Sequence, residues 1–170
     1  VESDDWGAGP PNQAVALESL TRVLQRHRDA DGRHPVLNLA LVLAVPDGAA
    51  IRECGEYRRV ELDDARLASV RSAIVQGQAL GVFAPQLHGL EHYWPPSLMA
   101  SPEPAVQDWL RQDGPSTTEH LPSPLQSRWT DVRRLPSSAL DEAQLRAAIA
   151  EEVAVFTRVF GVAPAVVVPP

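Results

Sequence analysis

One almost wholly aliphatic run, from Val36 to Val45, limits the folds open to this chain more than any other feature. Asn38 is its only polar residue. A short strand that is apolar on both faces is buried on both faces, which is typical of parallel sheets covered by helices. The turn sequence at 46–48, Pro-Asp-Gly, ends the run. The sequence therefore predicts a buried strand of a parallel sheet.

Helical and strand-like patterns alternate along the rest of the chain. Apolar residues recur at helical spacing in residues 12–28, 63–76 and 139–160. Short apolar runs at 80–84 and 165–168 predict two further strands, and the chain begins as though another strand were finishing. Alternating strands and helices predict an α/β fold with a parallel sheet.

The segment at 93–138 interrupts this alternation. It is rich in proline and serine, and we expect little regular structure there apart from a short helix at 103–112. Ser138 is the expected N-cap of the last helix, with Asp141 as its capping-box partner, and Gly161 is the expected C-cap. An irregular segment of this length is more often functional than idle.

The length and hydrophobicity fit one domain. The chain has 170 residues and is 44% hydrophobic, which is enough for a single core spanning 1–170. It starts at Val1 in what resembles the end of a strand and stops at Pro170 just after another. We therefore expect a single domain that belongs to a longer protein.

The charged residues exclude several function classes. The net charge is −7 and the pI is about 5.2, which disfavours binding to nucleic acid. No lysine is present, so Schiff-base chemistry and a Walker-type phosphate loop are excluded. Cys54 is the only cysteine, so neither an intrachain disulfide nor a thiolate cluster is expected. No run is long enough to span a membrane, and no signal peptide is visible, which favours a cytoplasmic location.

Polar residues gather where the expected strands end. Asp4 and Asp5 follow the first strand, and His88 and His92 follow the strand at 80–84. The carboxyl ends of parallel strands form one edge, where α/β proteins bind ligands. Two imidazoles four residues apart, with a carboxylate at the same edge, predict a site for one divalent metal ion.

At these positions the chain resembles a known family, the polysaccharide deacetylases. The resemblance rests on Asp-Asp-Trp-Gly at 4–7, His-x-x-x-His at 88–92 and Phe-Gly-x-x-Pro-x-x-x-x-Pro-Pro at 160–170, which occur in the family's order across nearly the whole chain. These proteins are metal-dependent carbohydrate esterases. The resemblance implies an α/β fold in the form of a distorted or incomplete (β/α) barrel with parallel strands.

The resemblance also implies a role for each matching residue. Asp4 is the general base that activates metal-bound water, and Asp5, His88 and His92 bind one divalent ion, with zinc expected. The reaction implied is removal of an acetyl or other acyl group from a saccharide or a similar N- or O-acylated substrate. Near these motifs, four residues are expected to contact the substrate: Trp6, Trp94, Pro169 and Pro170.

Two other hypotheses stay open. Val168 stands where the family carries an arginine that orients the base, and the histidine that acts as general acid has no match before Pro170. A noncatalytic relative that binds carbohydrate is therefore one alternative. The other is a zinc metallopeptidase, because residues 88–92 also match His-x-x-Glu-His with Glu91 as the base. That motif needs a helix, and its third ligand would come from Glu151 or Glu152.

Overall fold

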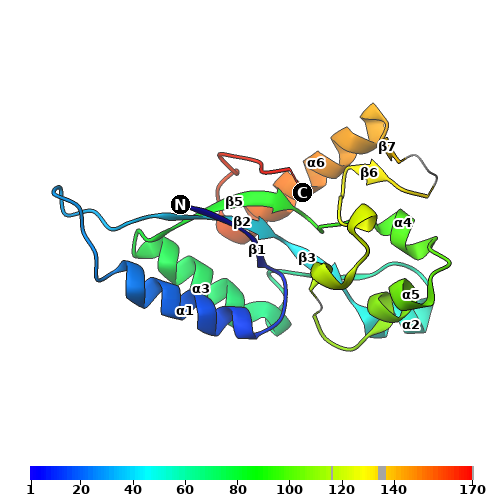
Figure 1. The fold of residues 1–170 in the computed structure, drawn as a ribbon, viewed down its shortest axis with the longest axis horizontal. Coiled ribbons are helices and arrows are strands. Elements are labelled where there is room, and N and C mark those ends of the chain that lie inside the picture. Colours follow the sequence, from blue (N-terminus) through cyan, green and yellow to red (C-terminus); the bar gives the residue numbers. More distant parts are fainter. Residues whose placement is uncertain (116, 134–136, 170) are drawn as a thin grey trace.

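A parallel three-stranded sheet lies at the centre of the protein (Figure 1). The computed structural model describes residues 1–115, 117–133 and 137–169. The strands β1 (Glu2–Gly7), β2 (Leu37–Val42) and β5 (Phe83–Gly89) pair in the order β1-β2-β5. The middle position of β2 explains its aliphatic sequence, in which only Asn38 is exposed. The α/β class and the parallel sheet are confirmed, whereas the described strands do not close into a barrel.

Helices pack against this sheet. α1 (Asn12–Leu24) and α3 (Ala68–Ala79) lie side by side, and α3 also contacts β1 and β5 (Figure 1). A 3₁₀ turn, η1 (Ala65–Leu67), precedes α3, and α6 (Glu142–Phe160) packs against β5. The larger core is mostly aliphatic and includes Leu17, Leu39, Leu41, Val70, Ile74 and Phe156.

Two helix boundaries differ from those predicted. α1 ends at Leu24 rather than at residue 28, because residues 25–28, Gln-Arg-His-Arg, have no apolar side chain to bury against the core. The N-cap of α6 is Asp141, not Ser138: its carboxylate accepts from the Gln144 backbone at 2.8 Å, and Gln144 completes a capping box. The predicted C-cap at Gly161 is confirmed by its left-handed conformation, with φ of 73°.

The aliphatic run does not form a single strand. β2 ends at Val42, and after Leu43 a separate strand, β3 (Ala44–Pro46), pairs antiparallel with β4 (Arg59–Glu61). The stretch between them contains α2 (Gly48–Cys54). The side chain of Asp47 caps this helix by accepting from the Ala50 backbone at 3.1 Å.

The strand predicted at 80–84 lies further along the chain. Leu80 and Gly81 complete the turn after α3, where Gly81 has φ of 69°. β5 occupies Phe83–Gly89, so His88 is part of the strand rather than of the loop after it. The last predicted strand, at 165–168, is reduced to one parallel bridge between Val167 and Leu87.

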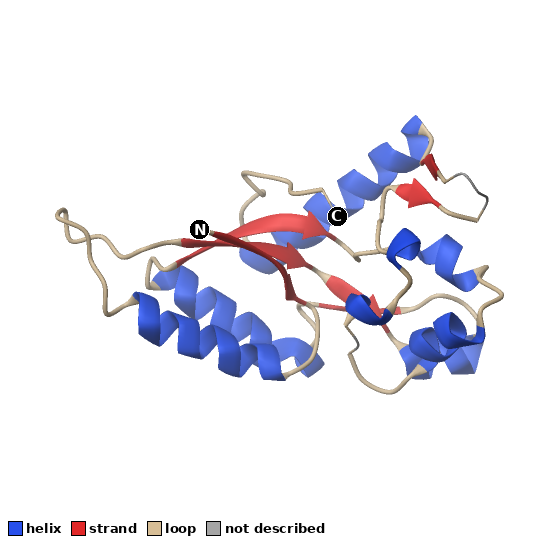
Figure 2. Cartoon of the chain, in the orientation of Figure 1, coloured by secondary structure: helices blue, strands red, loops and turns tan. Residues whose placement is uncertain are grey.

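The segment at 93–138 is more regular than expected. It holds α4 (Pro95–Met99), α5 (Pro104–Arg111), two 3₁₀ turns, η2 (Thr118–His120) and η3 (Ser123–Leu125), and the strand β6 (Thr130–Asp131), which pairs with β7 (Ser138–Ala139). Figure 2 shows α4 and α5 as a lobe beside the sheet. This lobe and α2 share a second apolar cluster, in which Trp109 is buried. None of the described helices combines the length and hydropathy needed to cross a bilayer.

Candidate metal centre

Asp5 lies in a bulge of β1. Ser3 pairs with Leu39 and Trp6 with Leu41. Asp4 and Asp5 together therefore oppose the single residue of β2 that lies between Leu39 and Leu41. Asp5 has φ of 60° and is the only non-glycine residue with a positive φ in the described part of the chain. Such a conformation is unfavourable for a side chain that bears a Cβ. Strained bulges of this kind re-aim side chains next to functional sites.

His88 lies in a second bulge, on the other side of β2. Leu87 pairs with Leu41 and Gly89 with Val42, so His88 is the extra residue. Its side chain is buried, and its Nδ1 lies 3.1 Å from the carbonyl oxygen of Val168. That carbonyl can only accept, so Nδ1 carries the proton and the lone pair of Nε2 is free to bind a cation.

His92 reaches the same point from the bend that follows β5. Its Nε2 lies 3.4 Å from Oδ1 of Asp5, and Nε2 of His88 lies 3.5 Å from the same oxygen. The two imidazole rings are 4.9 Å apart between centroids. Nε2 of His88, the nitrogen nearest Asp5, is buried and has no hydrogen-bond partner among the described residues. Buried polar atoms without a partner call for an explanation, and a bound ion is one.

These distances suit a cation with tetrahedral coordination. One ligand atom from each of Asp5, His88 and His92 lies within 4.8 Å of the others, and the described residues contain no other group of this kind. With bonds of about 2.0–2.1 Å to zinc, two ligand atoms of a tetrahedral site are about 3.3–3.4 Å apart. The observed separations of 3.4 and 3.5 Å are close to this spacing. Two imidazoles and one carboxylate leave a fourth position for water or substrate.

The three side chains also influence one another's protonation. The imidazole of His88 lowers the pKa of the Asp5 carboxyl group; partial burial opposes this change, and His92 adds to it. Burial works against a charge on His88, but the Asp5 carboxylate and the Val168 carbonyl outweigh it and raise the pKa of His88. Without a cation, the site therefore holds a negative carboxylate beside an imidazole that protonates more readily than usual.

The proposed base, Asp4, shares the bulge with Asp5. It is exposed, and its carboxylate makes no hydrogen bond or ion pair with another described residue. Its negative charge contributes to the raised pKa of His88, which places it in the vicinity of the metal centre.

The residues expected to contact substrate have different surroundings. Trp6 is partly buried against the core, with its indole N–H donated to Ser3 Oγ at 2.9 Å. One face of Trp94 is occupied by the guanidinium of Arg128, 5.8 Å from the ring centre. Pro169 is exposed and follows the residue that orients His88, and Pro170 lies outside the described residues.

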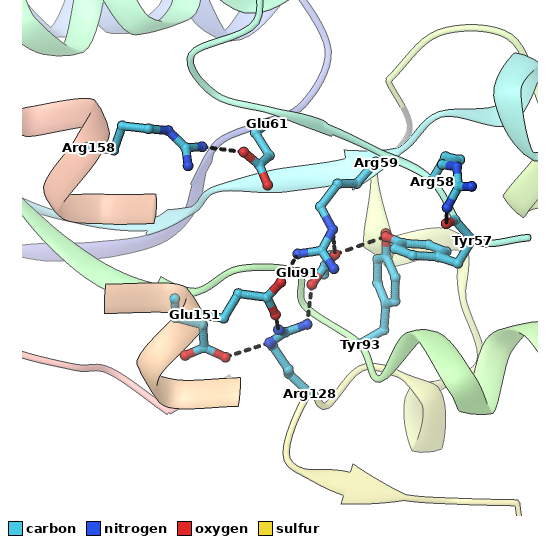
Figure 3. A network of polar contacts seen from close by, with 10 residues as sticks. Tyr57, Arg58, Arg59, Glu61, Glu91, Tyr93, Arg128, Glu151 and Arg158 are labelled. Atoms are coloured by element: carbon cyan, nitrogen blue, oxygen red, sulfur yellow. Dashed lines mark hydrogen bonds and ion pairs between the residues drawn. The ribbon is translucent and has the colours of Figure 1, made fainter. Parts of the chain in front are cut away.

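Glu91 does not face the two histidines. It is fully buried, and its carboxylate pairs with Arg128 and with Arg59, the latter at 3.1 Å (Figure 3). Tyr57 donates a further hydrogen bond to it at 3.1 Å. Residues 88–92 form the end of a strand and a bend, not the helix that the peptidase motif requires.

Two features of the site were not predicted from the sequence. The Val168 carbonyl orients His88 through its backbone, which no side-chain pattern reveals. A cavity of about 110 Å³ opens beside Asp5 and Gln13 and is bounded on the far side by Thr117, Thr118 and Glu119. The indole of Trp109 anchors that boundary by donating to the Thr117 carbonyl at 3.0 Å.

Gly7, at the end of β1, lies close to the backbone of β2. It has φ of 113°, and an added Cβ would overlap the carbonyl oxygen of Val42. We expect Gly7→Ala to lower the free energy of unfolding by about 1–3 kcal/mol in chemical denaturation. Gly32→Ala is the matched control, because its φ is also positive, at 80°, but nothing lies within 4 Å. Equal losses in the two variants would show that the contact with Val42 is unimportant.

No protein-family model matches the chain, and no curated protein or solved structure matches it either.

Proposed function

We propose that this chain is a metal-dependent hydrolase that removes an acyl group, acetyl in the first instance, from a saccharide or a similar N- or O-acylated compound. The observation that carries the proposal is the meeting of Asp5, His88 and His92, whose ligand atoms lie within 4.8 Å of one another although they come from distant parts of the sequence. A carboxylate and two imidazoles with an open position form the donor set of catalytic zinc sites.

The strand order supports the resemblance to the polysaccharide deacetylases. In the sheet, β2 lies beside β1, β5 lies beside β2, and the bridge at Val167 lies beside β5. Each later strand along the chain is thus placed next to the preceding one, in the same direction across the sheet. Strands follow one another in this way around a (β/α) barrel, whereas doubly wound sheets reverse direction. We propose that the sheet is part of an incomplete barrel, with the metal centre at the carboxyl ends of its strands.

In this proposal each residue has a distinct task. A divalent cation held by Asp5, His88 and His92 would supply a Lewis acid that polarises the acyl carbonyl and acidifies water. Asp4, exposed in the same bulge, accepts the proton. The Val168 carbonyl keeps the Nε2 lone pair of His88 directed at the site. Trp6, Trp94 and Pro169 remain proposed contacts for the sugar.

The alternatives differ in their support. For the peptidase, Glu91 would have to act as the base, but arginines and a tyrosine occupy its carboxylate. A noncatalytic relative draws support from Val168, because the base then has no guanidinium partner; Asp4 indeed forms no ion pair with another described residue.

Replacing Asp4 by asparagine separates these possibilities. We expect Asp4→Asn to keep its metal but to release acetate from acetylated oligosaccharides about 10²–10⁴-fold more slowly, the usual contribution of a general base. Glu2→Gln, which removes another exposed carboxylate of β1, should leave the rate unchanged. The measurements are metal content by elemental analysis and acetate release. If the metal-loaded chain releases no more acetate than the metal-free chain, the noncatalytic relative is correct.

A further inference from the structure

A buried ionic cluster includes Glu91, the residue that precedes His92 in the sequence. Arg128, from the segment at 93–138, has 1% of its surface exposed and pairs with three glutamates: Glu91, Glu151 and Glu152. Glu91 and Glu152 are fully buried. Figure 3 shows Glu91 between the guanidinium groups of Arg128 and Arg59. The cluster therefore joins the turn after β5 to β4, to α6 and to the segment at 93–138.

Stability alone is a weak reason for such a cluster. Burying ionised groups is unfavourable, and apolar residues of similar volume often stabilise a protein as well or better. Burial raises the pKa of both Glu91 and Glu152, although Arg128 opposes the rise in each. The best attested role of buried polar groups is to fix the register of the segments that carry them.

The segment held in register here carries a metal ligand. His92 lies in a bend, so no helix or strand fixes its backbone. Its two neighbours, Glu91 and Tyr93, are fully buried. The hydroxyl of Tyr57 lies 2.8 Å from that of Tyr93 and donates to Glu91, which joins the two anchors (Figure 3). With both neighbours held inward, His92 is directed to Asp5.

We propose that Arg128 is a positioning residue for His92: through Glu91 it holds the turn at 90–93 so that Nε2 of His92 stays within ligand distance of Asp5. This inference rests on the proposed function only for the statement that Asp5, His88 and His92 bind a divalent cation. It also gives the segment at 93–138 a role, because that segment supplies Arg128, which holds Glu91 next to His92.

The test measures metal binding rather than catalysis. Zinc affinity is determined by competition with a chromophoric chelator, well below the melting temperature, and ligand geometry by the visible absorption spectrum of the cobalt-substituted protein. Arg128→Met should bind zinc about 10–100-fold more weakly, the usual effect of removing a group that orients a ligand, and should alter the cobalt spectrum. Arg128→Lys, which keeps the charge, should recover part of the affinity.

Two further variants complete the design. Glu91→Gln should weaken zinc binding as Arg128→Met does, because it breaks the same connection to His92. Arg133→Met is the matched control: Arg133 lies in the same segment but is half-exposed, and it pairs with Asp131 at the surface. Its zinc affinity and cobalt spectrum should equal those of the unmodified chain. If Arg128→Met does not fold, Arg128→Lys and Glu91→Gln decide the question.

The outcomes separate this inference from the proposed function. If the unmodified chain binds no zinc, the metal centre is refuted, and the role of Arg128 with it. If the unmodified chain binds zinc and the folded Arg128 and Glu91 variants show the same affinity and the same spectrum, the metal centre stands and the positioning role is overturned. Equal weakening in Arg133→Met would also overturn it, since the effect would not be specific to the cluster.

Discussion

Replacing His88 by alanine is expected to remove the bound cation and, with it, any hydrolytic activity. The imidazole is buried, its Nδ1 is held by the Val168 carbonyl, and its Nε2 lies 3.5 Å from Asp5. The described residues contain no other group of three such ligand atoms, so the ion would lose one of its three proposed ligands. Elemental analysis should show one equivalent of zinc in the unmodified chain and background levels in His88→Ala.

A histidine outside the site provides the control for this prediction. His34 is half-buried and lies outside the site, and its Nδ1 is 2.9 Å from the carbonyl oxygen of His27. His34→Ala should therefore keep its zinc, and both variants should show the circular dichroism spectrum of the unmodified chain. A full equivalent of zinc in folded His88→Ala would rule out the proposed donor set.

The largest loss of stability is expected from Arg128→Met. Removing one partner of a buried ion pair leaves an uncompensated charge and typically lowers the free energy of unfolding by about 3–5 kcal/mol. Here Glu91 would keep Arg59, whereas Glu152 would lose its ion-pair partner, Arg128 Nε at 2.5 Å. Urea denaturation at neutral pH measures the difference.

An exposed arginine sets the scale for that measurement. Arg158 also pairs with two carboxylates, those of Glu61 and Asp63, but its side chain is half-exposed. Pairs of this kind contribute about 0–1 kcal/mol. Arg158→Met should thus be far milder, and similar losses in the two variants would mean that burial of the Arg128 cluster has little energetic importance.

The donor set could be predicted because it depends on strand order rather than on exact strand limits. The acidic pair at Asp4 and Asp5 and the histidines at 88 and 92 were placed at the carboxyl ends of parallel strands, where they meet. The strand before His88 was placed too early, but the error left His88 at the same edge of the sheet. The two bulges leave no pattern in the sequence, since they arise from pairing with β2.

The parts that could not be predicted depend on contacts distant in sequence. Arg128 stands in a segment without periodicity, and only the folded chain brings it to Glu91 and Glu152. The division of the aliphatic run after Val42 likewise depends on β4, which offers β3 a second partner. Burial of Glu91 makes it a structural residue, although its spacing from His88 fits a catalytic motif.

The position of β2 between the two bulged strands has a consequence for the order of folding. Asp5 and His88 lie on strands that are not neighbours, so their side chains come within reach of one another across β2, once β2 has paired with both strands. Their contact also closes a long stretch of chain, and contacts of that kind form slowly. Binding of an ion by all three proposed ligands would therefore follow assembly of the sheet. The ion would stabilise the folded sheet and would not nucleate its folding.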